Sequence, residues 1–390
     1  MNTHNQLYKI PSVLMRGGTS KGLIIKDIDL PSDPIKRDLL ISTIYGSSTN
    51  GQIDGVGGGT SLTSKLAIVG KTDKYDCDIL YTFGQVSVNS RKIDYNVTCG
   101  NMASAVGLFA VEEGLVDLEE GITTVKIYNT NTKRVMEVEV PVKDGMASYD
   151  GDFRISGVSG TSSLIMVNFL DFGGAYTGKL LPTGNVIDFV TGKNSKEVEV
   201  TIMDVGNVLV FVRAKDFSIK GTELSEEINN NQLLNEQLEY IRIECGKMLG
   251  IFGQDEVISP ETHALPKIVL VSEPIDYTNE SGSLVSKSSI NINGRYITMG
   301  KLHRAFAVSG SIGLGAACKI PGTIPNLLAT SDSSTEVIIG HPTGTLLVSV
   351  DLRKTDNSYT LVKGGTGRTA RRIMEGNALI PTKVLERSNN

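Results

Sequence analysis

Short apolar runs recur along most of the chain and are separated by turn-forming residues. The runs are rich in Val and Ile, and Gly, Asn, Asp or Pro stands at their ends. Such runs are typical of β-strands. Helical spacing of apolar residues is less common, and we expect surface helices at residues 34–45 and 223–249. The pattern predicts a β-rich α+β protein rather than a regular alternation of strand and helix.

Two segments differ from these runs because they are rich in small residues and almost uncharged. Residues 99–116 read CGNMASAVGLFAVEEGLV, and residues 303–319 read HRAFAVSGSIGLGAACK. A surface helix keeps one polar face, whereas these segments would be apolar all round. We expect each to form a helix that runs through the middle of a wrapped sheet.

The two segments belong to a longer repetition. Five elements recur in the same order: a strand pair, a surface helix, an apolar strand, the small-residue helix and a final strand pair. Such a match indicates an internal duplication, with a seam near residues 180–189. We therefore predict two pseudo-equivalent domains, residues 1–184 and 185–390, with a C-terminal tail that can pack back on the first domain. A cleft between two such domains is a favoured place for a ligand.

Composition and charge narrow the class of protein. The 390 residues are 40% hydrophobic and 21% charged, as in globular proteins. The formal net charge is −5 and the basic residues are scattered, so we expect no nucleic-acid partner. We find no signal peptide, no membrane span and no zinc spacing among the four cysteines. We expect a cytoplasmic protein with free thiols, no metal site and no membrane partner.

Two glycine-rich segments carry candidate anion-binding groups. In MRGGTSKG, residues 15–22, two glycines let the backbone approach a ligand, and Thr19, Ser20 and Lys21 add donors. The spacing is not that of a P-loop, and a tight hairpin with a polar turn explains the motif equally well. In residues 52–70, three glycines lead to Ser64 and Lys65 at the mouth of an apolar strand. A half-buried lysine can act as a base, although an exposed lysine in a surface loop is the commoner case.

The first small-residue helix begins with Cys99, Gly100 and Asn101. The unpaired N–H groups of a helix N-terminus favour a thiolate or an anionic substrate there. Most lone cysteines are packing residues, but this position favours a functional one. His303 stands at the matching start of the second helix, and His341 lies in GHPTG. We expect both to face the cleft, with a hydrogen-bonded structural histidine as the alternative.

At these motifs the sequence resembles the PrpF family, which includes 2-methylaconitate cis–trans isomerase, methylitaconate Δ-isomerase and 4-oxalomesaconate tautomerase. The resemblance covers residues 10–381 and rests on MRGGTSKG, IDGVGG, FGQVSV, CGN, LPTGN, GTEL, IPGT, GHPTG and RTARRIMEG in this order. It implies the diaminopimelate-epimerase fold. In that fold two similar domains each wrap a sheet round a central helix, with the active site in the cleft.

The resemblance also implies roles for individual residues. The family's catalytic lysine falls on Lys65 and its cysteine on Cys99. The remaining matched positions would bind substrate or stabilise its negative charge: Thr19, Ser20, Lys21, Ser64, Gly100 and Asn101. The usual GNCGN reads Val97-Thr98-Cys99 here. The second helix offers His303 and, at its far end, Cys318, which argues against an epimerase with two opposed thiols.

We therefore predict an isomerase of a small unsaturated di- or tricarboxylate that needs no cofactor and no metal. A base removes a proton, an allylic carbanion forms, and reprotonation shifts or rotates the double bond. One alternative is an amino-acid epimerase or racemase on the same fold. Another is a non-catalytic partner of an aconitase-like dehydratase, beside which an isomerase could also act. We expect a homodimer, the commonest oligomer.

Overall fold

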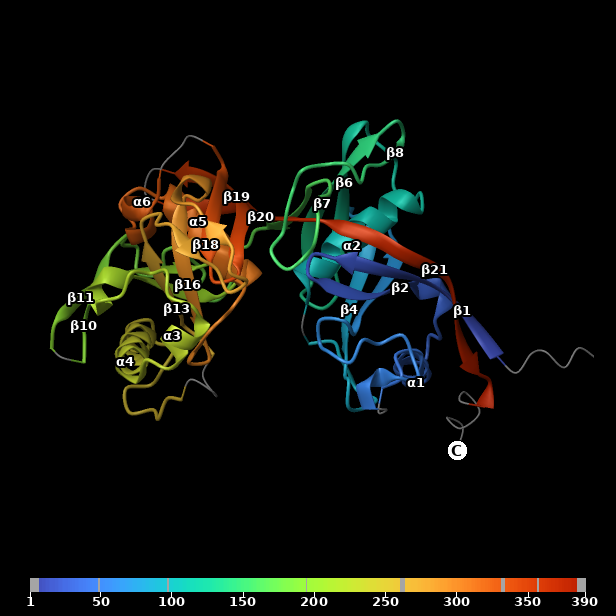
Figure 1. Ribbon diagram of the computed structural model, residues 1–390, viewed down its shortest axis with the longest axis horizontal. Helices are drawn as coiled ribbons and strands as arrows, with labels where there is room; N and C mark the ends of the chain where they lie inside the picture. The colour runs from blue at the N-terminus through green and yellow to red at the C-terminus, as the bar shows by residue number, and fades with distance from the viewer. Residues whose placement is uncertain are drawn as a thin grey trace, which may run out of the picture. The chain divides into compact units, whose positions relative to one another are not determined.

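The computed structural model describes residues 7–383, apart from residues 48–49, 97, 194, 260–263, 331–333 and 356–357. Val97, which departs from the family pattern, lies outside the described residues. The chain divides into two compact units (Figure 1). The first unit comprises Met1–Asn168 and Arg368–Asn390, and the second comprises Phe169–Gly367.

The first unit is built from strands and two helices. Its strands are β1 (Leu7–Gly17), β2 (Ser20–Lys26), β3 (Lys65–Lys71), β4 (Ile79–Val86), β5 (Ile93–Asp94), β6 (Gly121–Asn129), β7 (Arg134–Lys143), β8 (Met146–Ala147) and β21 (Ala370–Pro381), and its helices are α1 (Pro34–Ile44) and α2 (Gly100–Glu112). Strand β9 (Ile165–Leu170) reaches from this unit into the second. The C-terminal strand β21 pairs antiparallel with β1 along its length (Figure 1).

The second unit contains a corresponding set of elements. Its strands are β10 (Asp188–Thr191), β11 (Glu197–Asp204), β12 (Val208–Arg213), β13 (Lys267–Ser272), β14 (Tyr277–Thr278), β15 (Leu284–Val285), β16 (Ile292–Thr298), β17 (Lys301–Leu302), β18 (Glu336–His341), β19 (Gly344–Thr355) and β20 (Ser358–Arg368). Its helices are α3 (Ser225–Asn229), α4 (Gln232–Met248), α5 (Val308–Lys319) and α6 (Ile324–Leu328).

Strand pairing follows the same order in both units. In the first, β1–β2 is antiparallel, β2–β3 parallel, β3–β4 antiparallel, β4–β6 parallel and β6–β7 antiparallel. In the second, β11–β12 is antiparallel, β12–β13 parallel, β13–β16 antiparallel, β16–β18 parallel and β18–β19 antiparallel. The predicted α+β class and the internal duplication are therefore confirmed.

The central helices α2 and α5 are buried for most of their length, as the sequence predicts (Figure 1). Small residues allow the strands to approach closely. A Cβ on Gly107 would lie 2.4 Å from a methyl carbon of Val138, and one on Gly313 would lie 2.1 Å from a methyl carbon of Leu209. Larger side chains would push the sheet away from the helix.

The surface helices pack on the opposite face of each sheet. Helix α1 spans nearly the predicted range, and its N-cap Asp33 accepts a hydrogen bond from the Lys36 N–H at 2.9 Å. The single helix expected at residues 223–249 is wrong, because the structure has α3 and α4 there. Asn231 divides them: its side chain caps α4 by accepting from the Leu234 N–H at 3.1 Å.

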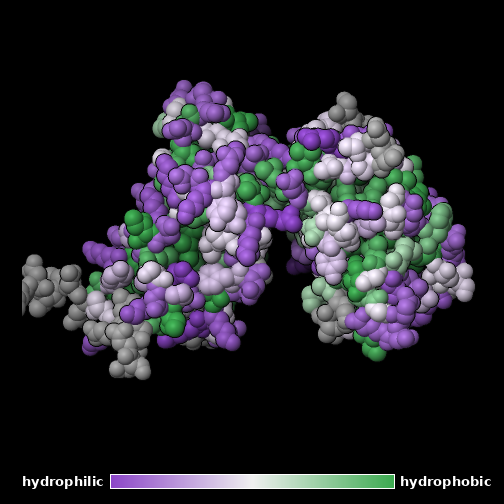
Figure 2. All heavy atoms as spheres, turned by 180° about the vertical axis from the view of Figure 1, so that it is seen from behind, coloured by the Kyte–Doolittle hydropathy of each residue, from purple (hydrophilic) through white to green (hydrophobic). Residues whose placement is uncertain are grey.

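The surface is mixed in character. On the face drawn in Figure 2, hydrophilic residues are spread over both units, and hydrophobic residues form small groups among the hydrophilic ones. Within the described part of the chain, no helix is both long enough and apolar enough to cross a membrane.

Candidate active site

The turn between β1 and β2 lies against the first turn of α2. Gly18 has φ +52°, and a Cβ there would lie 2.2 Å from the Asn101 Oδ1. A Cβ on Gly17 would lie 2.2 Å from the Asn101 carbonyl oxygen. The two glycines of MRGGTSKG therefore let the turn touch the helix, which a larger residue would prevent.

Asn101 joins this turn to the C-terminal part of the chain. Its Nδ2 donates to the Thr19 Oγ1 at 3.0 Å and to the Ser20 Oγ at 3.3 Å. Its Oδ1 accepts from the Arg368 Nε at 2.8 Å. Four side chains from three distant segments thus form one hydrogen-bonded network at the start of α2.

Arg368 opens the motif RTARRIMEG, whose arginines, by sequence, could either clamp carboxylates or cover a helix face. Its side chain is buried, and burial lowers its pKa to about 10, an effect partly offset by the negative charge that Cys99 can carry. A buried guanidinium beside a thiol and a helix N-terminus creates fixed positive potential there. The network is therefore suited to hold a carboxylate or to stabilise developing negative charge.

Lys65 is the first residue of β3. Its Nζ donates to the Gln85 Oε1 at 2.6 Å and lies 5.3 Å from the centre of the Phe83 ring. Successive strand residues face opposite sides, and Leu66 and Ile68 pack in the cluster that includes α1. Lys65 therefore lies on the other side, which faces α2. No carboxylate pairs with Lys65 among the residues that the structure describes.

Cys99 caps α2 and is half-buried, with a free thiol. Its carbonyl oxygen accepts from the Tyr81 hydroxyl at 3.4 Å. Tyr81 and Phe83 are two residues apart on β4, so their rings lie on one face of the sheet. The structure therefore brings Lys65 and Cys99 to the same side of the sheet, each touching an aromatic residue of β4.

Lys21 and Ser64 differ in their surroundings. The Lys21 backbone N–H donates to the Leu62 carbonyl at 2.9 Å, while its side chain is half-buried. The Ser64 hydroxyl is fully buried and donates to the Gln52 Oε1 at 2.6 Å. Ser64 therefore supports the glycine-rich loop in this structure, and its predicted role as a carboxylate ligand stays a prediction.

The two candidate histidines belong to the second unit. His303 does not begin the second central helix, because α5 starts five residues later, at Val308. The chain first forms the short strand β17, and the His303 N–H donates to the Tyr296 carbonyl at 2.8 Å. His341 is buried at the end of β18, and its Nδ1 lies 3.2 Å from the Thr343 Oγ1.

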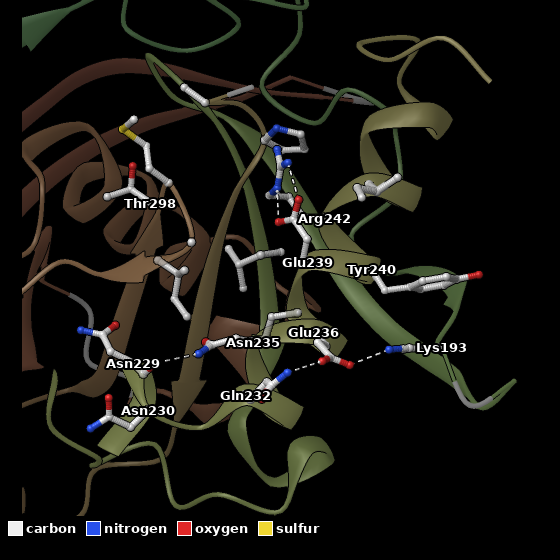
Figure 3. Close-up of a pocket in the computed structure, with 18 residues that line it drawn as sticks. Lys193, Asn229, Asn230, Gln232, Asn235, Glu236, Glu239, Tyr240, Arg242 and Thr298 are labelled. Carbon is white, nitrogen blue, oxygen red and sulfur yellow. Dashed lines mark hydrogen bonds and ion pairs between the residues drawn. The ribbon is translucent and has the colours of Figure 1, made fainter. Parts of the chain in front are cut away.

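The second unit also has a pocket on the α4 side of its sheet (Figure 3). Its volume is about 540 Å³, and Ile268 and Ile297 contribute to its lining. Arg242 in this pocket forms two hydrogen bonds of 2.7 Å with Glu239. None of the residues proposed from the sequence is among those that line it. Over the described residues, no group of three or more His, Cys, Asp or Glu side chains is placed to hold a metal ion.

Comparison with known proteins settles the family. The sequence model described as "PrpF protein" matches residues 7–381. The chain belongs to the PrpF family. The resemblance noted from its motifs is thereby confirmed over nearly the whole sequence.

Relatives that are named as isomerases are similar to this chain over almost their full length. The 3-methylitaconate isomerase of Eubacterium barkeri is 43% identical over 94% of this chain and 96% of its own. The 2-methyl-aconitate isomerase of Shewanella oneidensis is 33% identical over 96% of this chain and 97% of its own. The crystal structure of a methylitaconate-delta-isomerase superposes with a TM-score of 0.89 at 40% identity, and the match covers 98% of both chains.

Proposed function

We propose that this PrpF protein is an isomerase of a small unsaturated di- or tricarboxylate and that it works by proton transfer at an allylic carbon. The observation that carries the proposal is the placement of Lys65 and Cys99 on one side of the sheet. Cys99 is the N-cap residue of α2, and Asn101 of the same helix turn carries the network with Arg368. Gln85 holds the Lys65 Nζ on the same side of the sheet. The names of the relatives support an isomerase and suggest methylitaconate as the first substrate to test.

Lys65 is the main acid/base in this proposal. In its neutral form the amine takes a proton from the carbon next to the conjugated alkene, and the charge spreads over an allylic dienolate. The ammonium then returns a proton to the far carbon, which shifts the double bond, or to the same carbon after rotation. Gln85 holds the Lys65 Nζ at 2.6 Å and so fixes its direction.

The groups around α2 hold the substrate and its developing charge. Thr19, Ser20 and Lys21 supply donors for carboxylates. The N–H groups of Gly100 and Asn101 and the charge of Arg368 stabilise the dienolate. Cys99 serves as a second acid/base or as a close contact of the reacting carbon. Ser64, His303 and His341 remain candidates for substrate binding.

A turnover assay tests this proposal. The purified protein is incubated with methylitaconate, 2-methylaconitate and oxalomesaconate, and the products are followed by proton NMR. We expect isomerisation of at least one of them, with kcat reduced by ~10²-fold or more in Lys65→Gln. Full activity of Lys65→Gln on the best substrate would exclude Lys65 as the base.

The epimerase alternative has less support. Cys99 caps α2, whereas Ala307 caps α5 at the corresponding position. An epimerase with two thiol bases would need a thiol at each helix. Exchange of the Cα proton of an amino acid in D₂O would favour the alternative again. Independence from a cofactor, the cytoplasmic location, the homodimer and an aconitase-like dehydratase as partner remain predictions from the sequence.

A further inference from the structure

The duplication gives the candidate base Lys65 a counterpart. Lys65 is the first residue of β3, and Lys267 is the first residue of β13. The Lys267 Nζ donates to the Thr298 Oγ1 at 2.7 Å and lies 5.9 Å from the centre of the Tyr296 ring. In both units, the polar partner and the aromatic ring are two residues apart on the next antiparallel strand. The arrangement of lysine, ring and polar partner therefore occurs twice.

The turn in front of the central helix is repeated as well. The Asn207 Nδ2 donates to the Ser309 Oγ at 2.6 Å, which joins the β11–β12 turn to the second residue of α5. Asn101 makes the corresponding connection in the first unit. Val269 and Val271 pack in the cluster around α5, so alternation along β13 directs Lys267 to the α5 side as well. The second unit has thus kept the polar arrangement but not the thiol.

Within the described part of the chain, Lys267 has no negatively charged partner. Burial lowers its pKa, and the positive charge of Arg242 lowers it further. Glu239 is engaged by two hydrogen bonds from Arg242 (Figure 3). Among the described residues, no carboxylate lies within ion-pair distance of the Lys267 Nζ. Burying a cation costs free energy unless it is paired, so an anion that reaches Lys267 would stabilise its charged form.

His303 lies beside the same aromatic ring. Its ring meets that of Tyr296 edge-on, with the ring centres 6.1 Å apart. Its Nδ1 is buried, and no hydrogen-bond partner reaches it within the described structure. Burial lowers the pKa of His303, and the charge of Lys267 lowers it further. A buried polar nitrogen without a partner is unfavourable, so a ligand that accepts its hydrogen bond would stabilise the unit.

We propose that Lys267 and His303 form a carboxylate-binding site beside Tyr296 in the second unit. The carboxylate accepts one hydrogen bond from the Lys267 ammonium, which retains its bond to Thr298, and one from the His303 Nδ1–H. The proposal deepens the proposed function, since it rests on that function for the identity of the carboxylate. The group is either a carboxylate of the substrate or that of a separate small acid.

NMR of protein labelled with ¹³C-histidine tests the site without any turnover. The His303 signal is assigned with His303→Gln, and itaconate and acetate serve as probes, with chloride at equal ionic strength as the control. We expect the His303 signal to shift saturably with a carboxylate but not with chloride. Lys267→Gln should weaken this binding at least tenfold, Lys267→Arg should largely retain it, and Lys301→Gln, which changes an exposed lysine of the same unit, should leave it unchanged.

The outcomes distinguish a substrate carboxylate from a separate small acid. They also test the Lys267–His303 site separately from the proposed isomerase function. Substrate carboxylate is indicated if the midpoint of the His303 shift with itaconate equals the inhibition constant of itaconate in the turnover assay and Lys267→Gln raises both that midpoint and the KM of the substrate by the same factor. A separate acid is indicated if the shift occurs but KM and kcat do not change in Lys267→Gln. The site is overturned if no carboxylate moves the His303 signal, or if binding is equal in wild type and in a folded Lys267→Gln. If no substrate is turned over, the proposed function fails while the NMR result still decides the site.

Discussion

Replacing Asn101 with Ala should loosen the start of α2. The substitution removes two hydrogen bonds to hydroxyl groups, at 3.0 and 3.3 Å, and the bond at 2.8 Å from the Arg368 Nε. The bond to the guanidinium is charge-assisted and contributes about 1.5–3 kcal/mol, whereas each hydroxyl bond contributes about 0.5 kcal/mol. Arg368 is buried, so its guanidinium would lose this bond at a position shielded from bulk water. We expect a total loss of about 2.5–4 kcal/mol.

The second unit provides the matched control. Asn207→Ala removes a single neutral bond, to Ser309, and should cost about 0.5–1.5 kcal/mol. Hydrogen exchange followed by mass spectrometry reports the free energy of opening of α2 and of α5 separately, which matters because two compact units need not unfold together. Equal destabilisation of the two helices, or a loss below about 1 kcal/mol at α2, would refute the reasoning.

Two further predictions concern backbone contact and pH. A Cβ on Gly22 would lie 1.8 Å from the Lys65 carbonyl oxygen, so Gly22→Ala should separate β2 from β3, destabilise the protein by roughly 3 kcal/mol and lower kcat. The control is Gly253→Ala, whose Cβ meets nothing closer than 3.6 Å. Equal melting temperatures for the two variants would contradict the expectation. Burial raises the pKa of Glu113, but Lys26 and Arg372 lower it by more, so its pKa in the folded protein lies below the ordinary value of 4.5. The ionised carboxylate therefore stabilises the folded state above about pH 4.5, and this stabilisation is lost as the pH falls through the pKa of the folded protein. Glu113→Gln should therefore show a smaller fall in urea midpoint between about pH 5 and pH 3 than wild type, and an unchanged fall would show that Glu113 is not involved.

The parts of the fold that the sequence predicted are those with a local signal. Val- and Ile-rich runs give the strands, and the uncharged, small-residue segments give the central helices because only Gly, Ala and Ser allow strands to approach so closely, as at Gly107. The repeat was visible because both halves keep this order of elements. The division of residues 223–249 was missed, since it depends on the Asn231 side chain turning back to cap α4.

The sequence could group candidate site residues only where they are close in sequence. Thr19, Ser20 and Lys21 share one motif, as do Cys99, Gly100 and Asn101. Arg368 reaches Asn101 across 267 positions, because β21 pairs with β1 and returns the chain to the first unit. Long-range strand pairing leaves no periodic signal, so neither the contact of Arg368 with Asn101 nor the partnership of Lys65 with Gln85 could be predicted from spacing. Lys267 begins β13 as Lys65 begins β3, so comparing the two repeats could have identified Lys267 as the counterpart of Lys65.

The most direct test of the central claim is proton NMR in D₂O with methylitaconate, comparing wild type with Lys65→Ala. The account predicts that deuterium enters the substrate at an allylic carbon during isomerisation by the wild-type protein. In Lys65→Ala, both exchange and isomerisation should be lost, while far-ultraviolet circular dichroism stays unchanged. Isomerisation by a folded Lys65→Ala variant at the wild-type rate would contradict proton transfer through Lys65.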